Sequence, residues 1–154
     1  AIVSIDAFMY FGTDELFLNS LARFVKPGGQ VGIAQSGFVQ EIHHPVPAHL
    51  AEWWTMENPY CLHSADWWRR HWEQTRIVDV AVSDTLVDGW GYWHDWLTIM
   101  GSINPIEMRA LEEDAGRYLG YIRVVARRRE EAELFDPDLS LPSDYVKQPL
   151  LRSP

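Results

Sequence analysis

Apolar and polar positions at the start of the chain predict a strand, a helix and a second strand. Residues 1–5 form a short apolar run with β-branched side chains, as in a strand that is buried on both faces. Apolar residues then recur at helical spacing over residues 16–24, with Thr13 as the expected N-cap. The sequence PGG at 27–29 turns the chain into an apolar run at 31–34. This order predicts a βαβ unit with two parallel strands.

The rest of the pattern continues this alternation and predicts an α/β fold. The expected helices and strands are helices at 48–56, 65–74 and 105–115, a partly helical stretch at 88–103, and strands at 77–82 and 121–127. Prolines interrupt the chain after Asp136. We therefore expect one domain over residues 1–135 and an extended or disordered tail over 136–154.

Composition and charge exclude several classes of protein. Of the 154 residues 47% are hydrophobic and 13% aromatic, which is typical of a folded domain with a large core. The net charge of −9 argues against a nucleic-acid-binding protein, because phosphate binding needs clustered Lys and Arg. The arginines at 127–129 are followed by Glu130 and Glu131, which favours a solvated strand end. No stretch reaches the ~18 apolar residues of a membrane span, and the single cysteine, Cys61, makes the cytoplasm the expected location.

Three blocks of sequence together resemble one known family. They are AIVSIDAFMYFGTDELFLNSLARFVKPGGQVGIA at 1–34, LHSADWWRRHWEQTRIVDV at 62–80 and GRYLGYIRVVARR at 116–128. These blocks are similar to the C-terminal half of class I S-adenosylmethionine-dependent methyltransferases, namely the small-molecule enzymes related to cyclopropane fatty acid synthases. The resemblance implies a partial Rossmann-like methyltransferase sheet with helical insertions. Strands four to seven would lie at 1–5, 30–34, 77–82 and 121–127, the last one antiparallel between the fifth and the sixth.

The sequence also departs from that family in what it lacks. The family binds S-adenosylmethionine through a glycine-rich loop after its first strand and an acidic residue after its second. Neither is present, so the resemblance implies that this chain holds about half of a cofactor site. A buried strand at 1–5 would leave an exposed edge unless the missing N-terminal half, another chain or a second copy covers it. Met9 stands where the resemblance leads us to expect His, which argues against proton transfer at that position.

The end of the first strand holds the candidate cofactor contacts. Ligands of open α/β sheets lie at the carboxyl ends of the strands. The predicted cofactor-binding residues are Ser4, Ile5, Asp6, Tyr10 and Phe11. Asp6 is also a catalytic candidate, and a turn or helix cap is its alternative role. Tyr10 and Phe11 could equally pack on the neighbouring helix.

Polar residues that follow the second strand are candidates for substrate contact and catalysis. Gln35 and Glu41 are the predicted substrate contacts, and His43 and His44 are candidate bases. An ordinary surface loop is the favoured alternative for the two histidines. Adjacent histidine side chains point in different directions, so we expect no metal site.

Eight tryptophans lie in the segments between the strands, where the family places its substrate cover. Tryptophan faces attract cations and exclude water, so an aromatic lid would suit a hydrophobic or cationic small molecule. A role in the core is the favoured alternative for most of them. The predicted substrate-binding members are Trp54, Trp68, Trp93 and Trp96.

The resulting leading hypothesis is an S-adenosylmethionine-dependent methyltransferase that acts on a small molecule. The alternative is a non-enzymatic module, derived from half of a methyltransferase domain, that binds an apolar ligand or self-associates through its first strand. Cyclopropanation of a lipid alkene would share the family resemblance, but it needs a base that the sequence does not identify.

Overall fold

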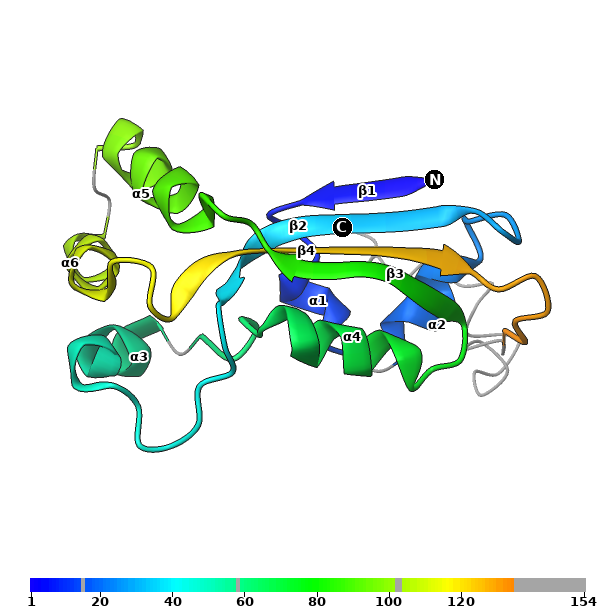
Figure 1. Ribbon diagram of the computed structural model, residues 1–154, viewed down its shortest axis with the longest axis horizontal. Helices are drawn as coiled ribbons and strands as arrows, with labels where there is room; N and C mark the ends of the chain where they lie inside the picture. The colour runs from blue at the N-terminus through cyan, green and yellow to red at the C-terminus, as the bar shows by residue number, and fades with distance from the viewer. Residues whose placement is uncertain (15, 58, 102–103, 135–154) are drawn as a thin grey trace, which may run out of the picture.

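The chain folds as a four-stranded sheet with helices on one face and further helices beyond one end of the strands (Figure 1). The computed structural model describes residues 1–14, 16–57, 59–101 and 104–134, so the predicted tail at 136–154 lies outside the described residues. The elements are β1 (Ile2–Ile5), α1 (Met9–Gly12), α2 (Phe17–Ala22), β2 (Gln30–Phe38), the 3₁₀ helix η1 (Ala48–Leu50), α3 (Ala51–Glu57), α4 (Ala65–Glu73), β3 (Val78–Thr85), α5 (Gly89–Ile99), α6 (Pro105–Asp114) and β4 (Leu119–Arg128).

The sheet confirms the predicted α/β class and strand order. Its strands lie in the order β1-β2-β4-β3, with β1 parallel to β2 and β4 antiparallel to both β2 and β3. The last strand is therefore inserted antiparallel between its neighbours, as the resemblance implied. Ile122, Val124 and Ala126 of this central strand have no exposed surface, which explains why the apolar run at the end of the sequence occupies the middle of the sheet.

The segment between β1 and β2 differs in detail from its prediction. Thr13 does not cap the following helix; it ends the short α1 instead, and α2 begins only at Phe17. The side chain of Asp14 accepts the N–H of Leu16 at 2.7 Å and so takes part of the capping role. The helix also ends early, at Ala22. An extra helical turn, α1, precedes α2, and Phe8 at the start of that turn lies in the core.

Phe8 is the centre of an aromatic core beneath the sheet. Its ring meets those of Trp68 and Trp72 of α4 edge to face, with centroids 5.7 and 5.5 Å apart. Trp68 is completely buried in this cluster. The buried face of α4 thus places Trp68 in the core, which is the alternative favoured for most of the tryptophans, and not at a surface that a substrate could contact.

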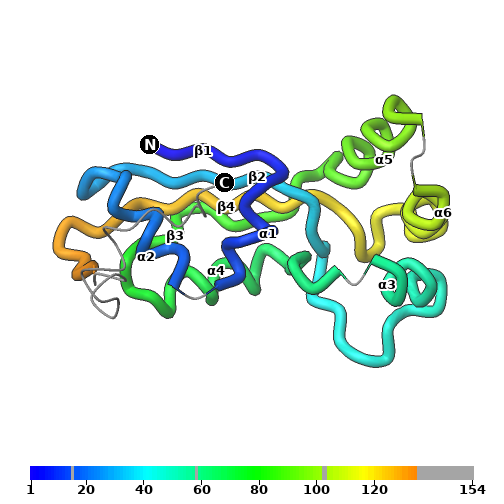
Figure 2. The backbone as a smooth tube through the Cα atoms, turned by 180° about the vertical axis from the view of Figure 1, so that it is seen from behind, coloured from blue at the N-terminus to red at the C-terminus, as the bar shows by residue number. Residues whose placement is uncertain are grey.

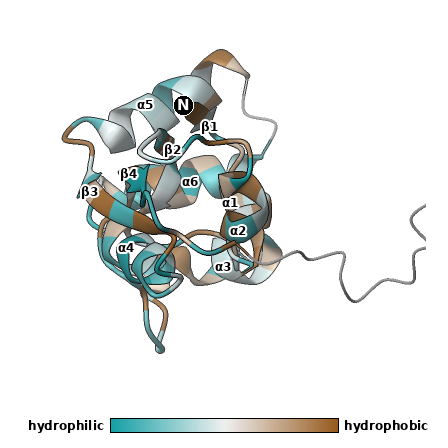
Figure 3. Cartoon of the chain, turned by 90° about the vertical axis from the view of Figure 1, so that its right-hand side faces the viewer, coloured by the Kyte–Doolittle hydropathy of each residue, from teal (hydrophilic) through white to brown (hydrophobic). Residues whose placement is uncertain are grey.

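Among the described residues, few cover the opposite face of the sheet. Helices α1, α2 and α4 lie on one side of the strands, as the side view also shows (Figure 3). On the other side, Val3 and Ile5 of β1 are 73% and 60% exposed. They line an apolar groove of about 280 Å³ together with Gly32 and Ala34 of β2 and Val125 of β4. We call this surface the open face; within the described residues, β1 is also an edge strand that pairs only with β2.

The arginines at the end of β4 are engaged within the molecule. Arg128 Nη1 donates to the carbonyl oxygens of Ala22 and Val25, and Arg129 forms an ion pair with Asp79. These contacts fasten β4 to the end of α2 and to β3. None of the helices in the described ranges is both long and apolar enough to cross a bilayer.

Candidate functional site

The carboxyl ends of three strands meet at one edge of the sheet. Strands β1, β2 and β3 run parallel and end there, and the antiparallel β4 begins there. Helices α3, α5 and α6 gather beyond this edge, seen together at one end of the molecule in Figure 2. Because ligands of open α/β sheets bind outside the carboxyl ends of the strands, this edge is the expected place for a functional site.

Two adjoining hollows open between this edge and the three helices. Their volumes are about 460 and 260 Å³, and we call them together the carboxyl-edge cleft. The two hollows share Met9, Tyr10, Ser36, Trp93 and Glu107. The larger one is also lined by Asp6, Trp96, Leu97 and Tyr121, and the smaller one by Trp53, Glu57, Pro59, Tyr60, Cys61 and Leu62.

Asp6 is held in place at the cleft by backbone and side-chain contacts. Its φ of 50° is in the left-handed region, which Asp tolerates better than most residues. The Asp6 N–H donates to the carbonyl of Ala34 at 3.0 Å, which extends the β1–β2 pairing by one residue. The carboxylate then accepts the N–H of Ser36 at 3.2 Å and the hydroxyl of Tyr121 at 2.5 Å. Strand pairing and these two bonds fix the direction in which the carboxylate points.

Two tyrosines beside Asp6 remain protonated hydrogen-bond donors over a wide pH range. Burial raises the pKa of the Tyr121 phenol far above its usual value, and the bond to Asp6 adds to the effect. Burial also raises the pKa of Tyr10, helped by the charges of Cys61 and Asp6. Both phenols therefore face the cleft as neutral groups at physiological pH.

Glu107 of α6 is a half-buried carboxyl that lines both hollows. Its Oε1 accepts the indole N–H of Trp93 at 3.0 Å. Burial raises the pKa of Glu107, the bond from Trp93 acts in the opposite direction, and the charge of Glu57 raises it further. The pKa of Glu107 is therefore raised because burial and the charge of Glu57 together outweigh the hydrogen bond.

Sequence reasoning missed Glu107 because its position has an ordinary explanation. Asn104 caps α6 by accepting the N–H groups of Ile106 and Glu107, and Pro105 occupies the first helical position. A glutamate at the third position of a capped helix is what a capping box requires, so the pattern indicates only a helix start. Tyr121 was assigned only to a strand, for a similar reason.

The predicted site residues divide into those that reach the cleft and those that do not. Asp6, Tyr10, Trp93 and Trp96 line it. Ile5 lines the groove of the open face instead. Ser4 pairs with Ile33 and so shares the covered face of the sheet. Phe11 packs on Phe8 and Phe17, which is the alternative considered for it.

At two predicted substrate contacts, Gln35 and Trp54, a neighbouring residue lines the cleft instead. Gln35 is completely buried on the covered face, and its neighbour Ser36 lines the cleft. Successive side chains of a strand alternate between faces, so the end of β2 presents only every second residue to the cleft. On α3, Trp53 lines the smaller hollow, whereas Trp54 stacks on Phe38 with ring centroids 5.6 Å apart.

Glu41 anchors a helix and lies outside the residues that line the cleft. One carboxylate oxygen accepts the N–H and the hydroxyl of Ser64, the N-cap of α4, at 2.8 and 2.9 Å. The other oxygen lies 2.8 Å from Nδ1 of His63. Burial pushes the pKa of Glu41 upward, but the hydrogen bonds from His63 and Ser64 outweigh it and lower the pKa overall. These bonds indicate a structural role, and the substrate contact predicted for Glu41 stays a prediction.

His43 and His44 are exposed in the loop that joins β2 to η1. Figure 1 shows this loop running away from the sheet before the chain returns at α3. Neither histidine lines the carboxyl-edge cleft, so the structure does not support the predicted catalytic role. In the described ranges no three His, Cys, Asp or Glu side chains gather closely enough to hold a metal ion.

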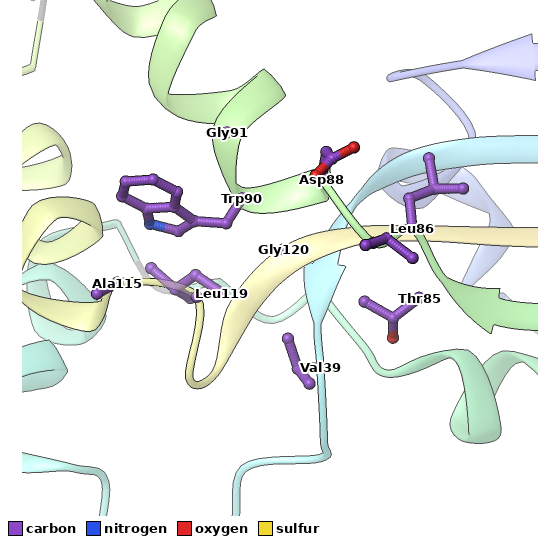
Figure 4. Close-up of a pocket in the computed structure, with 11 residues that line it drawn as sticks. Val39, Thr85, Leu86, Asp88, Trp90, Gly91, Ala115, Leu119 and Gly120 are labelled. Carbon is purple, nitrogen blue, oxygen red and sulfur yellow. The ribbon is translucent and has the colours of Figure 1, made fainter.

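A larger hollow of about 610 Å³ lies nearby, between the start of α5 and the start of β4 (Figure 4). Its lining is mostly apolar, with Val39, Leu119 and the ring of Trp90 around it and Asp88 as its one acidic residue. The indole N–H of Trp90 already donates to the carbonyl of Leu111 at 2.8 Å. Its described lining residues offer no pair of groups for acid–base chemistry, so the carboxyl-edge cleft is the stronger candidate, although each of its two hollows is smaller.

The solved structures to which this fold is similar include methyltransferases. Phosphoethanolamine N-methyltransferase 2 from Haemonchus contortus, solved with phosphomonomethylethanolamine and S-adenosylhomocysteine, matches 82% of this chain at 14% identity, with a TM-score of 0.57. Geranyl diphosphate C-methyltransferase from Streptomyces coelicolor, solved with Mg²⁺, geranyl diphosphate and S-adenosyl-L-homocysteine, also matches 82% of it, at 19% identity with a TM-score of 0.56.

The match covers only part of those enzymes. The chain spans 32% of the first structure and 46% of the second. Comparison of the sequence alone with protein-family models and with curated proteins gives no match. The chain therefore has the fold of part of a class I methyltransferase domain, with mixed parallel and antiparallel strands in the order described above.

Proposed function

We propose that this chain forms part of an S-adenosylmethionine-dependent methyltransferase that acts on a small molecule. The observation that carries the proposal is the carboxyl-edge cleft, where parallel strands β1 and β2 end and Asp6 is held by Ser36 and Tyr121. The cleft occupies the position that open α/β sheets use for ligands. The shared fold of the methyltransferase structures supports the same reading.

The chemistry of the cleft fits the cofactor. S-adenosylmethionine carries a positive sulfonium and a positive amino group, and the described residues of the cleft include acidic Asp6 and Glu107 but no Lys, Arg or His. Asp6 and Tyr10 are the residues that would hold it at the end of β1. When bound, the cofactor supplies an activated methyl group.

Methyl transfer requires alignment and exclusion of water more than acid–base groups. Trp93 and Trp96 of α5 wall the cleft and would exclude water from it. Tyr121 would keep the carboxylate of Asp6 oriented through its hydrogen bond. In this proposal the residues of α5 and α6 contact the substrate, and those of β1 and α1 contact the cofactor.

We further propose that additional polypeptide covers the open face and completes the cofactor site. Val3 and Ile5 leave an apolar surface on the edge strand β1, which favours pairing with a further strand. The methyltransferases with this fold are two to three times as long as the segment that matches, which supports a covering segment from the same protein. The expected cytoplasmic location stays a prediction.

Calorimetric titration of S-adenosylhomocysteine tests the proposal. The titration is performed on this chain and on the full-length product of the gene that encodes it. We expect saturable binding to the full-length product, weakened by Asp6→Asn and unaffected by the exposed-loop substitution His43→Ala. Absence of binding to the full-length product would exclude the methyltransferase function.

A second candidate is a non-enzymatic module that self-associates through β1. The exposed edge and the open face favour it, because a second copy could cover both. Sedimentation equilibrium distinguishes the two. The self-association model predicts that this chain forms a dimer and that Val3→Lys dissociates it. Self-association is excluded if the chain is a monomer and the full-length gene product binds S-adenosylhomocysteine.

A further inference from the structure

We propose that the carboxyl-edge cleft recognises an organic cation, with the Glu107 carboxylate as its counter-charge and the rings of Trp93 and Trp96 as its walls. The inference rests on the proposed function only in assigning this cation to the substrate side of the methyl transfer. Recognition of the cation itself requires no cofactor, and it is tested without one.

The charges around the cleft are of one sign. Asp6, Glu57 and Glu107 line it, and the described lining residues include no Lys, Arg or His. A carboxylate in a partly dry site is destabilised by the loss of water, and a bound cation restores the lost interaction. An anionic group such as a phosphate would be repelled by these carboxylates.

Glu107 is the half-buried member of these three acids, since Asp6 and Glu57 are exposed. Asp6 already receives two hydrogen bonds, from Ser36 and Tyr121. Glu57 accepts from the amide of Asn104. Glu107 accepts only the indole N–H of Trp93, through Oε1, and its Oε2 has no partner among the described residues. The free oxygen on a residue that lines both hollows points to Glu107 as the ligand's counter-charge.

Polar groups beside the hollows differ in whether a ligand can reach them. Trp53 lines the smaller hollow, but its indole N–H is fully buried and has no partner among the described protein atoms, so it presents its ring rather than its N–H. The phenol of Tyr10 belongs to a residue that is 63% exposed and lines both hollows, so a ligand oxygen can reach it. The ligand class that uses Glu107 and this phenol is a cation that also carries a hydroxyl or carbonyl oxygen.

Aromatic rings complete the environment of a cation. Trp93 lies between the two hollows, and Trp96, 57% exposed, lines the larger one. Tyr10 and Tyr60 add two further rings. The negative faces of such rings attract alkylammonium groups, and quaternary ammonium groups are bound in this way by aromatic cages.

The test uses choline as the probe, because it combines a quaternary ammonium group with a hydroxyl. Its binding to the full chain is measured by calorimetry, next to that of its neutral isostere, in which carbon replaces nitrogen, and of phosphocholine. We expect choline to bind roughly tenfold more tightly than the neutral isostere, and phosphocholine to bind more weakly than choline.

Variants of the same helix show whether Glu107 carries this preference. Glu107→Gln removes the charge but keeps an oxygen that accepts from Trp93, and we expect a loss of roughly tenfold in choline affinity. Glu113→Gln is the matched control, since it removes one charge from an exposed position of α6. Trp96→Leu tests the aromatic wall independently, with an expected loss of several-fold.

Several results would overturn the inference. They are absence of choline binding, equal binding of the neutral isostere, tighter binding of phosphocholine, and an equal effect of Glu113→Gln and Glu107→Gln. S-adenosylmethionine and its neutral product S-adenosylhomocysteine are titrated into the full-length gene product as well. If Glu107→Gln weakens only the binding of S-adenosylmethionine, the carboxylate faces the cofactor and the inference fails. If choline binds but neither cofactor binds, only the proposed function is overturned.

Discussion

The hydroxyl of Tyr121 donates a hydrogen bond to Oδ2 of Asp6, across 115 residues of sequence. Tyr121 also lies opposite Ser36 in the β2–β4 ladder, and the N–H of Ser36 donates to Oδ1 of the same carboxylate. One carboxylate thus joins the ends of β1 and β2 to the start of β4. This arrangement holds the three strands in register where the cleft begins.

Tyr121→Phe removes this hydroxyl and keeps the ring. We expect the free energy of unfolding to fall by about 1 kcal/mol at neutral pH. Burial and the bond to Asp6 raise the pKa of Tyr121, so the folded state keeps a proton that the unfolded state loses near pH 10. The contribution is therefore complete below about pH 10 and declines as the pH rises further. Urea unfolding at neutral and alkaline pH measures both effects.

Tyr92→Phe is the matched control, because Tyr92 is 55% exposed on α5. We expect it to leave the free energy of unfolding unchanged at both pH values. An equal loss in the two variants, or a difference from wild type that grows in alkali, would contradict the role assigned to the Asp6–Tyr121 bond.

The sequence predicts those residues of the site whose position follows from the pattern within one segment of the chain. Asp6 follows a short apolar run, and the rule that ligands lie at the carboxyl ends of strands needs no further information. Trp93 and Trp96 were expected from their place between strands. The antiparallel insertion of β4 followed from the resemblance, since periodicity alone does not give strand order.

The remaining parts depend on contacts that periodicity does not encode. Glu107 and Tyr121 reach the cleft from α6 and β4, roughly a hundred residues beyond Asp6, and each fits an ordinary helix start or strand. Whether Gln35 or Ser36 faces the cleft depends on the register of β2, and a shift of one residue exchanges them. The aromatic packing of Phe8 decides that Trp68 lies in the core.

Glu41→Ala distinguishes an anchoring role from substrate contact. The substitution removes the acceptor of three hydrogen bonds at the start of α4, and we expect a loss of about 1–2 kcal/mol in the free energy of unfolding. Because hydrogen bonds from His63 and Ser64 lower the pKa of Glu41 despite burial, its contribution is present at neutral pH and is lost as the pH falls through that lowered pKa. Thermal unfolding at several pH values measures it.

Glu41→Ala is also compared with His44→Ala in the choline titration. Neither residue lines the cleft, so we expect choline affinity to remain within twofold of wild type in both. His44 is exposed, so its substitution is also expected to leave stability unchanged. A selective loss of choline binding by folded Glu41→Ala would restore Glu41 as a substrate contact.

Glu107→Gln is expected to stabilise the free protein at neutral pH. Burial, more than the charge of Glu57, raises the pKa of Glu107, so the folded state holds a proton that the unfolded state releases above about pH 4.3. As the pH rises from the unfolded-state pKa of glutamate to the raised folded-state pKa of Glu107, wild type therefore loses stability relative to Glu107→Gln. The difference in Tm between the two proteins should vanish at acid pH and grow toward neutral pH. Glu113→Gln should show no such trend, and a parallel trend would trace the effect to the charge of α6 as a whole.

Gln35→Met changes a residue on the covered face of the sheet and should stabilise the protein. Gln35 has no exposed surface, and neither Oε1 nor Nε2 has a hydrogen-bond partner among the described protein atoms. A buried amide without partners costs about 1–3 kcal/mol, and methionine fills a similar volume without polar atoms. We expect urea unfolding to give a gain of about 1–2 kcal/mol, against a change below about 0.5 kcal/mol for the exposed control Gln40→Met. A loss of stability in Gln35→Met would instead mean that the amide is satisfied by an internal water, and the end of β2 would then hold a polar site on each face.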